Sequence, residues 1–172
     1  KVGFIGGFNI GDDYLSRVPE WAPWRDTAVE VTGHAVLAMQ IRFFLDWNYA
    51  AKDDKVEYAA RYFPDDEAAE DAWLPMQIVS GGPDTYWNPI KESYLKLITL
   101  ASESVYIQTP YFIPDESIMD ALRMAALSGI DVRIMMPAKP DHMFVYWAGY
   151  SYIEQLLDAG VRAYTYDTGL GK

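Results

Sequence analysis

Two strings in the first part of the sequence carry the side chains best suited to chemistry. Gly6-Gly7-Phe8-Asn9 places an amide directly after a glycine pair. Trp24-Arg25-Asp26 places a carboxylate just before a stretch with strand-like alternation. Taken singly, the first string is typical of a turn and the second of an aspartate on the surface. An aspartate beside tryptophan can also be a buried acceptor that orients a histidine, so both interpretations stay open.

Two further strings lie in the second part of the sequence. Tyr111-Phe112-Ile113-Pro114-Asp115 is most simply a loop with core aromatic residues that leads into a helix capped near Asp115. Pro140-Asp141-His142 holds a loop histidine, and a lone histidine is more often an ordinary polar residue than a ligand or catalyst. The sequence shows no combined set of nucleophile, base and orienting group, so these residues alone define no reaction.

The composition excludes several classes of site and partner. The chain has 172 residues, no cysteine and only two histidines, which excludes disulfides and cysteine nucleophiles and argues against multi-histidine metal centres. Its net charge of −11 argues against a general binder of the nucleic-acid backbone. Apolar residues make up 51% of the chain, enough to form a core. No apolar run approaches the roughly 18–20 residues that span a bilayer.

The elements that must position these strings follow from the hydrophobic pattern. Strands are expected over residues 2–8, 27–32, 76–80, 104–109, 131–136 and 161–166, and helices over residues 33–50, 88–101, 115–128 and 144–158. Strands that alternate with helices predict an α/β fold with a largely parallel sheet. Ligands of such sheets usually bind beyond the carboxyl ends of the strands, where Asn9, Gln108 and residues 137–142 are expected.

Two features bear on how the chain is organised. Residues 53–71 hold eight acidic and two basic side chains, a net charge of −6 that predicts a solvated linker, with a specific cation site as the lesser alternative. The chain opens on Val2-Gly3-Phe4-Ile5, which is already strand-like. We therefore expect an excerpt of a longer protein, the alternative being an edge strand at a natural terminus.

Taken together and in order, four strings resemble the bacterial cardiolipin synthases of the phospholipase D superfamily. They are residues 6–14 (GGFNIGDDY), 24–27 (WRDT), 106–115 (YIQTPYFIPD) and 139–142 (KPDH). The resemblance covers essentially the whole chain. It implies a phospholipase D-like fold, a mostly parallel or mixed sheet flanked by helices. Residues 1–50 would end the first half, residues 51–74 form an acidic linker, and residues 75–172 begin the second half.

The resemblance also implies a chemistry. In this family each half carries a His-x-Lys-x4-Asp motif; one histidine attacks phosphorus, the other serves as acid and base, and lysines and asparagine amides hold the phosphate. No metal or other cofactor is implied. This sequence contains no His-x-Lys. At the position where the resemblance places the second motif, the sequence has Gly171-Lys172 without the expected histidine. The chain therefore resembles the stretch between the two motifs, and alone we expect it to be inactive.

Individual positions acquire expected roles from the resemblance. Asn9 matches an amide that contacts phosphate, and Asp26 matches the carboxylate that orients the first histidine. Substrate-facing positions are expected at Gly7, Gln108, Tyr111, Phe112 and His142.

The implied parent enzyme makes cardiolipin from two molecules of phosphatidylglycerol and releases glycerol. Its expected partners are anionic phospholipid and the bacterial cell membrane, to which N-terminal helices outside this chain would anchor it. The resemblance is also compatible with a homo-oligomer. The catalytic domain is expected to lie at the periphery of the membrane, and this segment is expected to be soluble. Nucleic acid is not expected to be a partner. Two alternatives stay open: a phospholipase D-type phosphodiesterase that hydrolyses lipid, and a non-catalytic domain that binds lipid or protein.

Overall fold

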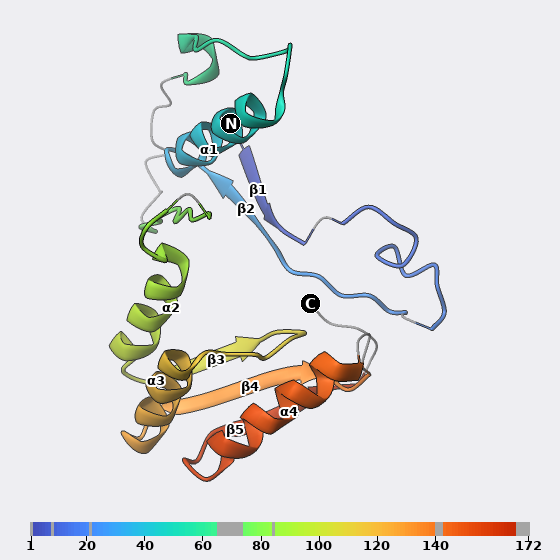
Figure 1. The fold of residues 1–172 in the computed structure, drawn as a ribbon, viewed down its shortest axis with the longest axis vertical. Coiled ribbons are helices and arrows are strands. Elements are labelled where there is room, and N and C mark those ends of the chain that lie inside the picture. Colours follow the sequence, from blue (N-terminus) through green and yellow to red (C-terminus); the bar gives the residue numbers. More distant parts are fainter. Residues whose placement is uncertain are drawn as a thin grey trace. The chain divides into compact units, whose positions relative to one another are not determined.

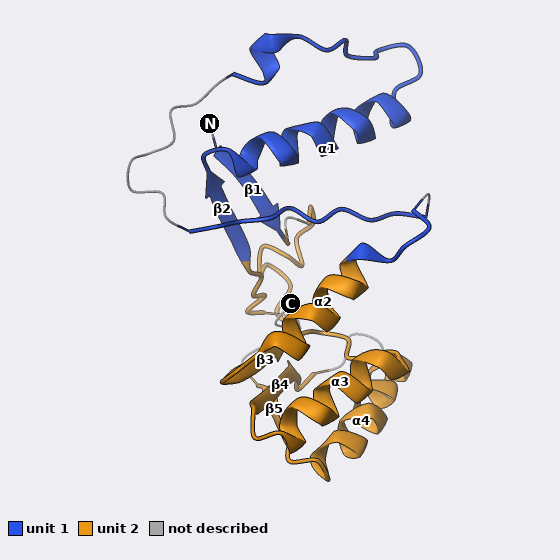
Figure 2. Cartoon of the chain, turned by 90° about the vertical axis from the view of Figure 1, so that its left-hand side faces the viewer, with its two compact units in different colours: residues 1–6, 28–89 blue, residues 7–27, 90–172 orange. Residues whose placement is uncertain are grey.

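The structure divides into two compact units. It is a computed structural model that describes residues 2–7, 9–20, 22–64, 74–83, 85–139 and 143–167. Unit 1 comprises Lys1–Gly6 and Ala28–Pro89, and unit 2 comprises Gly7–Thr27 and Ile90–Lys172 (Figure 2). The loop that carries Trp24, Arg25 and Asp26 thus belongs to the same unit as the C-terminal part of the chain. Domain boundaries near residues 50 and 74 stay a prediction.

Unit 1 is built on a hairpin of two strands and one long helix. Strands β1 (Val2–Gly6) and β2 (Ala28–Thr32) pair antiparallel, with Gly3 opposite Val31. Helix α1 (Ala35–Ala50) follows, and a short 3-10 helix, η1, covers Ala60–Tyr62. The absence of a side chain at Gly3 lets the sulfur of Met39 on α1 approach β1 closely. The predicted strands and helix of this region are confirmed.

Unit 2 contains a parallel sheet. Strands β3 (Ser104–Gln108), β4 (Asp131–Pro137) and β5 (Arg162–Tyr166) pair in the order β3-β4-β5. Helix α2 (Pro89–Leu100) precedes β3, while α3 (Glu116–Leu127) and α4 (Met143–Leu157) connect the strands and cover one face of the sheet (Figure 1). This architecture confirms the predicted α/β class with a parallel sheet flanked by helices.

The core of unit 2 lies between the sheet and the two helices that cover it. On β4 the side chains of Val132, Ile134 and Met136 are buried, whereas Arg133 and Met135 between them are only half-buried. This alternation follows from the pleat, which sends successive side chains to opposite faces. Leu122 of α3 and Leu156 of α4 are among the largest fully buried side chains. The packing of α3 and α4 on this face holds the sheet in place.

The strand predicted over residues 76–80 is wrong, whereas the helix predicted over residues 88–101 is confirmed as α2. Residues 76–80 form no strand; Met76 is 44% and Val79 37% exposed, and no strand pairs with them among the described residues. A short apolar run has the composition of a strand, but without a neighbour its backbone completes no ladder. Along α2, Ile98 is the one buried residue, and Leu97 beside it is 68% exposed.

The sheet face away from α3 and α4 carries a charged cluster around Asp131. Arg133 donates to the Asp131 carboxylate at 2.7 Å, the Tyr106 hydroxyl donates at 3.0 Å, and Arg162 also pairs with it. The guanidinium of Arg133 lies 4.9 Å from the centre of the Tyr106 ring. These contacts, led by the hydrogen bonds from Arg133, lower the pKa of Asp131 to about 2.

We expect this carboxylate to make the stability of unit 2 acid-sensitive. The pKa of Asp131 is lower in the folded chain than the ordinary value near 3.8, so its stabilising effect is complete above about pH 4. The effect is lost as the pH falls from about 4 to about 2. The measurement is the urea midpoint of the wild type and of Asp131→Asn at several pH values. The variant should be less stable at pH 6 and match the wild type near pH 2; a pH-independent difference would contradict the assignment.

Among the described helices, none is both long and apolar enough to cross a membrane.

Candidate functional site

The side chain of Trp24 holds the carboxylate of Asp26. The indole Nε1 donates to Asp26 Oδ2 at 2.9 Å. Trp24 is itself fixed: its backbone N–H donates to Ser16 Oγ at 2.8 Å, and its ring meets Tyr14 edge to face with centroids 4.7 Å apart. Asp26 is half-buried. The loop therefore presents a carboxylate in a defined orientation, the arrangement that a group orienting an imidazole requires.

Gly7 lies directly against this carboxylate. A Cβ atom added at Gly7 would sit 2.5 Å from Asp26 Oδ1 and 2.6 Å from Asp26 Cγ, closer than real contacts allow. The Gly7 backbone N–H also donates to the Thr27 carbonyl at 3.5 Å. Gly7 does not adopt a positive φ, so the requirement for glycine here comes from space and not from backbone conformation. The start of the Gly7-Phe8-Asn9 string is thereby brought to Asp26.

Arg25 brings this segment to the carboxyl ends of two strands. Its Nη1 donates to Gln108 Oε1 at 3.0 Å, and Gln108 is the last residue of β3. Its guanidinium carbon lies 5.8 Å from the centre of the Tyr166 ring, and Tyr166 is the last residue of β5. In parallel sheets this edge is the usual place for ligands. The Trp24-Arg25-Asp26 segment therefore lies where chemistry is expected in such a fold.

The loop after β3 combines a half-buried tyrosine with a buried phenylalanine. The Tyr111 backbone N–H donates to Thr109 Oγ1 at 3.3 Å, which shapes the turn. Phe112 is only 5% exposed and belongs to the core, which favours a packing role for its ring. The cavity beneath this loop is about 10 Å³, room for about one water molecule and none for a lipid.

Asp115 ends that loop and caps α3. Its Oδ1 accepts hydrogen bonds from the Ile118 backbone at 3.0 Å and from Ser117 Oγ at 2.7 Å, and Lys91 forms an ion pair with it. Lys91, followed by these two donors, holds the pKa of the Asp115 carboxyl well below its usual range. The cap predicted near Asp115 is confirmed, and it fixes where the loop joins the helix.

The predicted site residues are brought together only in part. Gly7 and Asp26 touch, and Gln108 is tied to the residue beside Asp26. Asn9 is exposed and makes no hydrogen bond to Asp26 or Gln108 within the part of the chain that the structure describes. His142 lies outside the described residues. The roles of these side chains toward substrate stay predictions.

Arg25 is the residue that sequence reasoning missed, because its string drew attention only to the tryptophan and the aspartate. The alternation of an extended backbone could have provided a signal. Successive side chains point to opposite sides, so when Trp24 and Asp26 meet on one side, Arg25 must point to the other. Its partners could not be found from the sequence, since Gln108 is 83 residues away.

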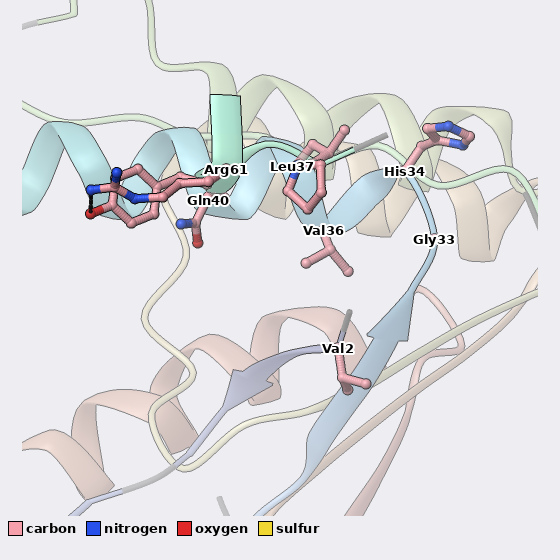
Figure 3. Close-up of a pocket in the computed structure, with 9 residues that line it drawn as sticks. Val2, Gly33, His34, Val36, Leu37, Gln40 and Arg61 are labelled. Carbon is pink, nitrogen blue, oxygen red and sulfur yellow. Dashed lines mark hydrogen bonds between the residues drawn. The ribbon is translucent and has the colours of Figure 1, made fainter. Parts of the chain in front are cut away.

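A larger cavity lies in unit 1 and contains none of the predicted site residues. It measures about 300 Å³ and is lined mainly by apolar side chains, among them Val2, Val36 and Leu37. Arg61 and Gln40 stand at one end and His34 at the other (Figure 3). Arg61 is occupied by its neighbour, donating to the Tyr62 hydroxyl at 3.0 Å. Nothing in this cavity resembles a catalytic set, and within the described ranges no three acidic or histidine side chains gather to hold a metal.

The parallel sheet and its helices match a known family. Residues 94–171 match the family described as "Cardiolipin synthase, PLD-like domain". These residues are similar to the phospholipase D-like domain of the cardiolipin synthases. The match includes Gln108 and Tyr166, so both partners of Arg25 lie inside the matched residues.

The likeness extends over nearly the whole chain. It is 51% identical over 168 residues to a cardiolipin synthase of Listeria innocua and 49% identical over 169 residues to one of Staphylococcus aureus strain Mu50. Each alignment covers 98% of this chain and 34% of the relative, so the chain spans about a third of the length of the curated relatives it matches. A structural match to a solved polyphosphate kinase from Porphyromonas gingivalis covers 41% of this chain and 10% of the kinase chain. Its TM-score is 0.31 and its sequence identity 20%, which is too remote to bear on the fold.

Proposed function

We propose that this chain is part of a phosphatidyltransferase that joins two phosphatidylglycerol molecules into cardiolipin. The observation that carries the proposal is the identity of about half of all residues, over 98% of the chain, with proteins named cardiolipin synthase. The surroundings of Asp26 also support the proposal. Its carboxylate accepts a hydrogen bond from the Trp24 indole and lies against Gly7, so it has a defined orientation that is suited to orienting an imidazole.

The proposed reaction exchanges one phosphodiester for another through a phosphohistidine. A histidine of the parent enzyme attacks the phosphorus of phosphatidylglycerol, the bond to glycerol breaks, and a second histidine gives the departing alkoxide its proton. That second histidine then takes the proton from a hydroxyl of another phosphatidylglycerol, which attacks phosphorus and breaks the bond to nitrogen. Both histidines lie in His-x-Lys motifs, which this sequence does not contain.

In this proposal the chain's own residues orient the groups that react and bind the substrate. Asp26 holds the attacking imidazole in one tautomer and stabilises its positive charge. The Asn9 amide donates to a phosphate oxygen, and Gly7 leaves the space in which the Asp26 carboxylate sits. We infer that Gln108, Tyr111 and His142 contact the lipid, and that Phe112 contributes through the core in which its ring is buried. The enzyme acts at the bacterial membrane, anchored by helices outside this chain, and self-association is part of the same proposal.

A product assay tests this function. The intact enzyme is incubated with vesicles of phosphatidylglycerol, and lipids are separated by thin-layer chromatography while glycerol is measured enzymatically. We expect cardiolipin and glycerol in equal amounts, and no product from the 172-residue chain alone. Phosphatidic acid as the sole product would replace the transferase with the hydrolase alternative, and no product at all would favour the non-catalytic binding domain.

A further inference from the structure

Arg25 is exposed, yet it is tied to positions far away in the sequence. Its guanidinium donates to Gln108 at 3.0 Å and lies over the Tyr166 ring at 5.8 Å. Arg17, in the same loop, offers a comparison: it pairs with Asp12, five residues away, at 2.8 Å. This partner of Arg17 lies in the loop, whereas both of these partners of Arg25 lie on the sheet.

The two partners of Arg25 lie on the same face of the sheet. Gln108 is in register with Met135 and Tyr166 with Pro137, and residues two apart on β4 share a face. That face is the one away from α3 and α4, because the intervening Met136 is buried in the core beneath them. Since β4 lies between β3 and β5, the guanidinium bridges the width of the sheet at its carboxyl edge.

We propose that Arg25 is a positioning residue that fixes the Asp26 carboxylate relative to this edge of the sheet. Trp24 and Gly7 set the orientation of the carboxylate within the loop, while Arg25 sets the place of the loop on the domain. A planar guanidinium suits this task, because it can donate to an amide and lie on an aromatic ring at once. The inference rests on the proposed function, in which Asp26 orients the attacking imidazole.

The kinetic test uses the intact enzyme. Arg25→Ala should lower kcat about tenfold with little change in KM, since it displaces an orienting group and not a lipid contact. Arg25→Lys should recover part of the loss, and Arg17→Ala, which removes the same charge from the same loop, should leave kcat unchanged. The acid-side pKa of the rate profile should also fall in Arg25→Ala, because a more distant carboxylate favours the imidazolium less. Equal kcat values for Arg25→Ala and Arg17→Ala would overturn the proposal.

A second measurement is independent of the chemistry. Amide hydrogen exchange of the intact enzyme should become at least about tenfold faster around residues 22–28 in Arg25→Ala and in Gln108→Ala, but not in Arg17→Ala. The double variant Arg25→Ala/Gln108→Ala should exchange little faster than Arg25→Ala, because both changes break one contact. Unchanged exchange in Arg25→Ala would overturn the positioning role. Faster exchange in an enzyme that makes no cardiolipin would support that role and reject the proposed function.

Discussion

Asp26→Asn is expected to lower the turnover of the intact enzyme by roughly 10²- to 10⁴-fold, the upper end being the loss of about 10⁴ seen when the orienting aspartate of a catalytic triad becomes asparagine. Asparagine has the size of aspartate, and its amide oxygen can still accept the hydrogen bond from Trp24 Nε1. The loop should therefore keep its shape. What the variant loses is the negative charge that stabilises an imidazolium and selects its tautomer. The measurement is kcat with phosphatidylglycerol vesicles, together with the melting temperature of the same preparation.

Asp12→Asn is the matched control for this variant. Asp12 lies in the same loop, its side chain is 68% exposed, and it is paired with Arg17. It loses the same charge, so any general effect of net charge on lipid binding should appear in both variants. Turnover that falls equally in both, or in neither, would show that Asp26 has no special role toward the imidazole.

The elements of unit 2 could be predicted because their signals are local. The helices end where Gly129 and Gly160 adopt positive φ values of 90° and 91°, conformations that glycine adopts without strain. Strand β4 alternates buried and half-buried residues, as a strand covered on one face must. These patterns depend on a few neighbouring residues, so they predict the elements without reference to distant contacts.

The failures arise where structure depends on partners far along the chain. Residues 76–80 have the composition of a strand, but a strand exists only when another strand pairs with it. The same reasoning applies to the site. The Trp24-Arg25-Asp26 string made Asp26 a candidate, since a tryptophan two residues from an aspartate is a local signal, but the role expected of Asp26 came from the resemblance. The contact from Arg25 to Gln108 crosses 83 residues, and nothing local to either residue announces it.

Gly7→Ala should disable the enzyme by a steric route and lower turnover by about a hundredfold, the cost of misplacing an orienting group by about 1 Å. The new methyl group would overlap Asp26 Oδ1, so the carboxylate must leave the indole of Trp24 or the backbone must retreat. Gly3→Ala is the matched control. Its methyl group would meet the sulfur of Met39 at 2.8 Å, and that flexible side chain can move aside without disturbing Asp26.

Combining the change at Gly7 with Asp26→Asn separates this steric route from a general loss of stability. If alanine at position 7 acts by displacing the carboxylate, it should lower the turnover of Asp26→Asn only slightly, because the charge is already gone. If it instead disturbs the fold or the nearby Asn9, the two losses should multiply. The cycle is measured as four kcat values with melting temperatures. A multiplicative result would show that Gly7 does not act through Asp26, and would assign its effect to the phosphate-binding string that follows it.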